Sequence, residues 1–276
     1  MLIDYTTKTI EVDNHVLETY RTCEEKYRLS IRDAQKPISG IPALAFGISM
    51  HAARQHYRQS VHGGTDRTKA VEEAVEEGQK AWDREMPQEM KEVVKVDDKR
   101  SRINLARLAK GYFQKYGGPE FETVACEVPF KRELGTTSTG WKVVYVGVMD
   151  ETVRYRDKVW PLEFKTSSSF YPPNDQFFSQ FHNKASITGY MWMVEQELGF
   201  KCSGAIIHAM WVHAEPAASS KSKYTLPDYF KMDYTYRTDE QMEEWKGNVL
   251  LTVEDILRSL EQDRWKRQDG AACILY

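Results

Sequence analysis

Three residues near the middle of the chain could support metal-assisted chemistry: Asp150, and Glu163 and Lys165 on either side of Phe164. In a strand, residues two apart point to the same face, so Glu163 and Lys165 project together while Phe164 turns the other way. Carboxylates are the oxygen ligands that Mg²⁺ or Mn²⁺ prefers, and a backbone carbonyl at Phe164 could complete the set. A lysine beside such an ion can orient water or stabilise negative charge on a phosphoryl group. These residue types are the ones that metal-dependent hydrolysis of a phosphodiester bond would need.

An ion pair between Lys165 and either acid is the simpler interpretation, because such pairs are common in strands. The surrounding residues favour the metal site. Leu162 and Phe164 are apolar, and the run VVYVGVM precedes Asp150. A charge at the end of a buried strand is costly unless it is paired or bound to a metal.

Helices dominate the first 117 residues, and strands follow. A periodicity of about 3.6 residues and local stop signals predict helices at 15–33, 43–61, 66–84, 98–116, 178–198 and 239–263. Runs rich in β-branched residues predict strands at 121–134, 141–155, 158–166 and 204–214. The first three strands should form an antiparallel meander, and the strand–helix–strand order that follows implies a crossover. We expect an α/β fold with a mixed central β-sheet flanked by helices.

One domain is expected over residues 1–276. Its parts are a helical N-terminal elaboration (1–118), a catalytic sheet core (119–236) and a C-terminal helix with a tail (237–276).

Composition narrows the class of protein. The formal net charge is −3, so binding to nucleic acid would need a local basic surface. Arg100, Arg102, Arg107 and Lys110 could follow a phosphate backbone. No apolar run approaches the ~18 residues of a membrane span, and the N-terminus has no secretory pattern. A cytoplasmic protein without a membrane partner is expected.

Several short motifs occur in the order of a known family. GVMD (147–150) and LEFKT (162–166) resemble the GxxD and (D/E)xK motifs of RecB-like PD-(D/E)xK nucleases. That group includes the CRISPR-associated RecB-like exonucleases and many phage-borne relatives. TCEEKYRL (22–29) resembles its C-x-x-x-Y element, and Gly47 to His51 matches its G-x-x-x-H element. The resemblance covers roughly residues 15 to 200, and four motifs in register are more specific than any one.

The resemblance implies a restriction-endonuclease-like core and a DNA nuclease, most typically an exonuclease in DNA processing, recombination or repair. It also implies that His51 is a third metal ligand beside Asp150 and Glu163. The helical pattern alone favours another interpretation: His51 lies on one stripe of its helix with Leu44 and Ile48, where a histidine is more often a core residue. DNA ends or single strands would be the substrate, and a helicase or recombination partner is left open.

A departure from the family occurs on the helix after the lysine. The family carries Q-x-x-x-Y there, and this chain has Ser186 and Tyr190. Tyr190 is thereby implied to help place the lysine and the nucleic-acid backbone, although it could equally be a core aromatic. The serine leaves room for a catalytically silent nucleic-acid-binding protein. A metal-free structural protein with Lys165 in an ion pair is the third possibility.

Many relatives carry an iron–sulfur cluster, which normally needs four cysteine thiolates. Cys23 and Cys273 lie near two of the family positions, whereas Cys126 and Cys202 fall in or beside predicted strands. An iron–sulfur cluster is therefore the lesser alternative in this chain, and we expect buried or free thiols rather than disulfides.

Aromatic residues follow the lysine, namely Phe170, Tyr171, Phe177, Phe178 and Phe181. They could stack on unpaired bases, but packing against the core is the expectation.

Overall fold

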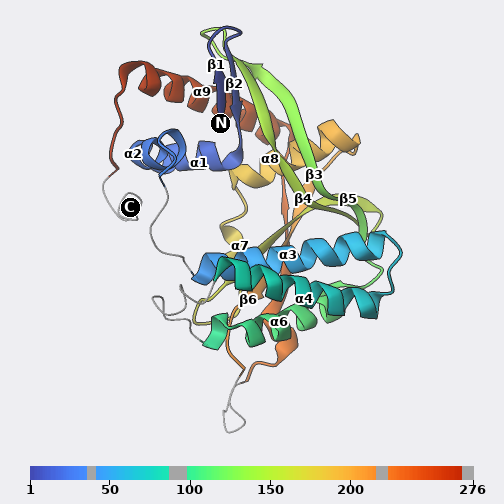
Figure 1. Ribbon diagram of the computed structural model, residues 1–276. Helices are drawn as coiled ribbons and strands as arrows, with labels where there is room; N and C mark the ends of the chain where they lie inside the picture. Colours follow the sequence, from blue (N-terminus) through green and yellow to red (C-terminus); the bar gives the residue numbers. More distant parts are fainter. Residues whose placement is uncertain (36–41, 87–97, 216–222, 269–276) are drawn as a thin grey trace.

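The computed structural model describes residues 1–35, 42–86, 98–215 and 223–268 (Figure 1). The strands are β1 (Leu2–Asp4), β2 (Thr9–Val12), β3 (Glu122–Thr136), β4 (Lys142–Tyr155), β5 (Lys158–Ser167), β6 (Gly204–Trp211) and β7 (Phe230–Tyr236). The helices are α1 (Asn14–Thr22), α2 (Glu24–Tyr27), α3 (Pro42–His62), α4 (Arg67–Glu85), α6 (Arg102–Tyr116), α7 (Asp175–Ser179), α8 (Ala185–Leu198) and α9 (Asp239–Gln262). A π-helical turn at Arg28–Arg32 and 3₁₀ turns at Asp98–Arg100 and Leu226–Tyr229 complete the described elements.

The long strand β4 organises the sheet. On one edge, β3 runs antiparallel along nearly its whole length. On the other edge, β2 pairs in parallel with residues 142–145, and β5 pairs antiparallel with residues 152–155. Between these two stretches, residues 146–151 have no strand partner on that edge among the described elements. The sheet therefore opens locally, and Asp150 lies in the opening.

Beyond the opening, β5 turns to a new partner. It pairs in parallel with β6 from Leu162 to Ser167, and β7 pairs antiparallel with β6. The connection from β5 to β6 passes through α7 and α8, which is the crossover that a parallel pair requires. The described strands thus form a mixed sheet flanked by helices, as predicted.

Two hydrophobic cores hold the helices against the sheet. One joins α1, α8 and α9 to β2 and β4, and the other joins α3, α4 and α6 to β5 and β6. Figure 1 shows α3, α4 and α6 stacked together around β6, with α9 and α1 at the other end beside β2. Each fully buried large apolar side chain contributes about 1.5–3 kcal/mol.

The prediction of an entirely helical N-terminal part is wrong for the first twelve residues. They form a hairpin, β1–β2, and β2 joins the central sheet beside β4. The strand β7, at the other edge of the sheet, was also not predicted from the sequence. These short strands follow from pairing with distant residues, which a local pattern does not show.

Two predicted helices are interrupted. The 15–33 helix breaks at Cys23, whose backbone is extended (φ −166°, ψ 116°). The 178–198 helix is replaced by α7 and α8, and the Arg237 guanidinium donates to the carbonyls of Phe181 and Lys184 in the gap. That distant arginine satisfies carbonyls that a continuous helix would have paired internally. In the described ranges, no helix is both long and apolar enough to cross a membrane.

Candidate metal centre

An imidazole and two carboxylates converge at the opening in the sheet. His51 Nε2 hydrogen-bonds Glu127 Oε1 at 2.9 Å, and His51 Nδ1 lies 3.8 Å from Asp150 Oδ2. Each of the three side chains offers a ligand atom within 4.8 Å of the others. In residues 1–35, 42–86, 98–215 and 223–268, this is the one group of three or more such side chains.

Glu127 was not among the predicted site residues. The β3–β4 register pairs Cys126 with Glu151 and Val128 with Met149, which sets Glu127 opposite Asp150. Its backbone has φ 55°, a left-handed conformation that costs a non-glycine residue roughly 1–3 kcal/mol. Such strain tends to persist where function needs it. The available signal was a single carboxylate inside the apolar run VACEVPF.

Helix α3 brings His51 to the strands, and Gly47, one turn earlier, faces β5. A Cβ on Gly47 would stand 3.9 Å from Thr166 Oγ1 of β5, so the helix runs close to that strand. Leu44 and Ile48, on the same stripe as His51, are 60% and 39% exposed. This stripe is therefore not a core face, which argues against a simple core histidine at position 51.

Glu163 and Lys165 lie together on β5 and form an ion pair, which is the contact that the simpler interpretation of the sequence expected. Lys165 Nζ lies 2.5 Å from Glu163 Oε1, with Glu163 buried and the lysine side chain 43% exposed. Glu163 is not part of the three-residue group. Continuing the β4–β5 register beyond Thr152 and Pro161 would set it opposite Asp150, but the strands stop pairing there.

Tyr190 on α8 lies beside both predicted acids. Burial raises the pKa of its phenol, and the charges of Glu163 and Asp150 raise it further. With Asp150 and Leu162, Tyr190 lines a small gap where β4 and β5 separate. Ser186, one turn earlier, stands at the position of the family's glutamine, and its buried hydroxyl has no hydrogen-bond partner among the described residues.

A buried arginine ties together the elements that carry these residues. Arg54, one turn after His51 on α3, forms an ion pair with Glu151, the neighbour of Asp150. Its guanidinium also stacks over the Phe164 ring at 4.4 Å. Burial alone would lower the pKa of Arg54, but Tyr112 and Glu151 raise it above its ordinary value. One side chain thus contacts α3, β4 and β5 directly behind the candidate centre.

A second arginine strengthens the attachment of α3. Arg58 Nε lies 2.6 Å from Glu151 Oε1, and its other nitrogens donate to the carbonyls of Phe121 and Tyr116. Arg54, Arg58 and Glu151 are all under one-tenth exposed. Buried charges that are paired in this way hold a specific arrangement, because moving any one of them would leave the others buried without an opposite charge.

The donor set fits a divalent ion. Ligands on opposite sides of Mg²⁺ lie about 4.2 Å apart, so three atoms within 4.8 Å can meet one ion after small adjustments. Carboxylate oxygens with one imidazole nitrogen suit Mn²⁺ and Mg²⁺ better than they suit soft metals. His51 and Asp150 therefore meet as predicted, with Glu127 as an added acid. Roles for Glu163 and the Phe164 carbonyl stay predictions.

The cysteines differ in part from the expectation of free or buried thiols. Cys23 is disulfide-bonded, which the sequence did not predict, and Cys273 lies outside the described residues. Burial raises the pKa of Cys126 and of Cys202 to about 12. Both thiols are therefore protonated at neutral pH.

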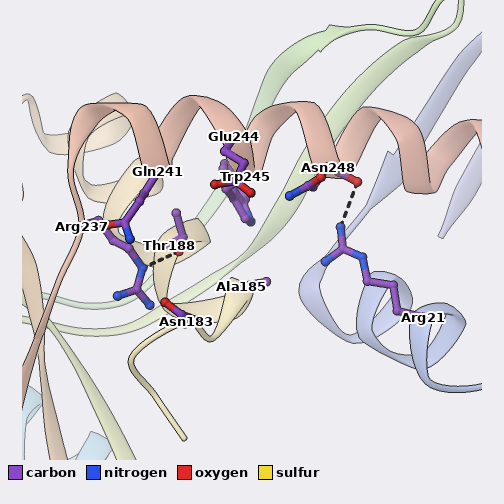
Figure 2. Close-up of a pocket in the computed structure, with 9 residues that line it drawn as sticks. All are labelled: Arg21, Asn183, Ala185, Thr188, Arg237, Gln241, Glu244, Trp245 and Asn248. Carbon is purple, nitrogen blue, oxygen red and sulfur yellow. Dashed lines mark hydrogen bonds between the residues drawn. The ribbon is translucent and has the colours of Figure 1, made fainter. Parts of the chain in front are cut away.

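Another pocket, of about 380 Å³, lies between α8, α9 and α1 (Figure 2). Its most buried cation is Arg237, whose donors already reach the Thr188 and Thr235 hydroxyls and three backbone carbonyls. Since this guanidinium is fully engaged within the fold, the pocket is a structural junction between helices and not a second catalytic centre.

Comparisons with known proteins identify a family and a similar fold. The family model of the PD-(D/E)XK nuclease superfamily matches residues 15–274. A candidate exonuclease from Eubacterium rectale has a similar structure, with a TM-score of 0.51 and 13% identity, over 99% of this chain and 92% of that chain. SSO0001 matches over 87% of this chain and 84% of its own, with 14% identity and a TM-score of 0.32. No curated protein matches the sequence. Since the family model spans nearly the whole chain, this protein belongs to the PD-(D/E)XK nuclease superfamily.

Proposed function

We propose that this protein is a divalent-metal-dependent DNA nuclease that acts as an exonuclease on DNA ends or single strands. The observation that carries the proposal is the convergence of His51, Glu127 and Asp150 at the opening of the sheet, in a chain of this nuclease superfamily. His51, Asp150 and Glu127 would hold Mg²⁺ or Mn²⁺, with Glu163 and the Phe164 carbonyl at its border.

The chemistry divides between the ion and the chain. A bound divalent ion would polarise the phosphoryl oxygen and make a coordinated water more acidic. The half-exposed Lys165 ammonium would orient the attacking water and offset the charge that grows on the phosphate. Glu163, held at 2.5 Å, would fix the position of that ammonium. Tyr190 would support the same arrangement from α8.

The proposal is tested by digestion assays with Mn²⁺ on circular plasmid and on end-labelled single strands. The parent should degrade the end-labelled strand and leave the closed circle intact, and Lys165→Ala should abolish cleavage while the fold is kept. A Lys165→Ala protein that cuts as fast as the parent would overturn the assignment. Cleavage of the closed circle would support a nuclease but reject the exonuclease mode.

One observation favours a second candidate, a catalytically silent nucleic-acid-binding protein. Ser186 stands where the family has glutamine, and its hydroxyl reaches no partner. A parent that binds DNA but leaves both substrates uncut with Mn²⁺ would support that candidate.

A further inference from the structure

The segment that follows the catalytic strand β5 presents two aromatic rings to solvent. Phe170 is 84% exposed and Tyr171 is 58% exposed, and their rings meet edge to face at 4.9 Å. The expectation that they pack against the core is therefore wrong for these two residues. By contrast, Phe178 and Phe181 are buried. The two rings touch and so form one contiguous exposed apolar patch, which is the kind of surface that often marks a binding site.

The rings stand on a fixed segment. The indole of Trp211 donates to the Ser169 carbonyl at 2.8 Å, and the Ser169 hydroxyl donates to the Tyr171 carbonyl at 2.7 Å. Arg100 donates to the Ser168 hydroxyl at 2.7 Å. Pro172 and Pro173 follow directly and restrict the backbone. The backbone that carries the two rings is thus held in place, so less entropy would be lost when a flat partner stacks on them.

A cavity adjoins this segment. It has a volume of about 560 Å³, and its lining combines charged, hydroxyl and aromatic groups from three segments, namely Asp98, Lys99, Ser168, Ser169, Phe170, Val212, His213 and Ala214. Lys99 and the neighbouring Arg100 bring positive charge to this side, and Asp98 is the acid among the lining residues. Phe170 is five residues from Lys165, so their Cα atoms are at most about 18 Å apart.

We propose that Phe170 and Tyr171 stack on unpaired bases of a single-stranded substrate and so guide it towards the metal centre. This proposal rests on the proposed function and names its substrate class. Every base has a π-face, so stacking binds single strands whatever their sequence. In a duplex the faces are already stacked on neighbouring bases, so an intact duplex would gain nothing from the rings.

Binding is measured in the Lys165→Ala background, which keeps the probe uncut, by fluorescence anisotropy with labelled oligo(dT) and with a blunt duplex. Replacing both Phe170 and Tyr171 by alanine should weaken oligo(dT) binding about ten-fold or more. Duplex binding should change less than about two-fold. The matched control is Tyr5→Ala, since Tyr5 is 66% exposed at the distant β1–β2 hairpin and should alter neither affinity.

An unchanged affinity for oligo(dT), or an equal loss for both probes, would overturn the proposal. With Lys165 present and Mn²⁺ added, the double variant should raise KM for single strands and leave kcat unchanged. The two proposals fail separately. A parent without cleavage whose aromatic variant still loses oligo(dT) selectively rejects the nuclease but keeps the stacking surface. A parent that cleaves, together with an aromatic variant that binds oligo(dT) normally, keeps the nuclease but rejects the stacking surface.

Discussion

Replacing Glu151 by glutamine should destabilise the fold far more than loss of a surface ion pair. Glu151 is 5% exposed and is the common partner of Arg54 and Arg58, both of which are also buried. Glutamine has nearly the same shape but no charge, so two guanidinium groups would stay buried without their anion. Removing one partner of a buried pair typically costs about 3–5 kcal/mol. In a chain of this size, that corresponds to a fall in Tm of roughly 10 °C.

The assay is urea and thermal unfolding of the parent and Glu151→Gln, followed by circular dichroism. The matched control is Glu122→Gln, since Glu122 is exposed on β3 and pairs with Arg154 at 3.4 Å. The control should unfold like the parent, because exposed pairs contribute little. A loss of less than about 1 kcal/mol for Glu151→Gln would refute the claim that this buried cluster fastens α3 to β4.

Three other predictions concern buried groups. Burial, and then Arg54 and Arg58, lowers the pKa of His208 well below 6.5, so its contribution to stability is complete above pH 6.5 and is lost as the pH falls. His208→Gln should therefore lose less stability than the parent between pH 7 and 5, and equal slopes in unfolding titrations would contradict this. Burial raises the pKa of Cys202 to about 12, so its thiol should react with a disulfide reagent at pH 8 only after unfolding. Gly189→Ala should lower the free energy of unfolding by about 1–3 kcal/mol, because the added Cβ would stand 2.2 Å from the Tyr145 hydroxyl oxygen. The control is Gly247→Ala in the same denaturation assay, which should be neutral or stabilising because position 247 is open.

Local patterns were enough to predict the sheet core. β4 and β5 begin and end within one residue of their predicted bounds, because both are rich in β-branched and aromatic residues and a turn at Arg156 and Asp157 separates them. The helix period likewise placed α4 and α9 within two residues. These elements carry their own signals in the chain.

The remaining parts depend on distant partners. β2 is four residues long and is a strand because β4 offers it an edge. The break before α8 depends on Arg237, over fifty residues away in the sequence. The sequence could likewise place Asp150 and Lys165 on neighbouring strands but could not show where the strands stop pairing. Glu127 enters the group only through the β3–β4 register and its left-handed backbone.

The central claim is that His51, Glu127 and Asp150 hold one divalent ion. It is tested most directly by titrating Mn²⁺ into the parent, Asp150→Asn and Glu127→Gln in a calorimeter. We expect one saturable site in the parent, no measurable site in Asp150→Asn and at least ten-fold weaker binding in Glu127→Gln, since each variant removes a charged ligand. Parent-like binding in both variants, or no binding heat in the parent, would contradict the claim.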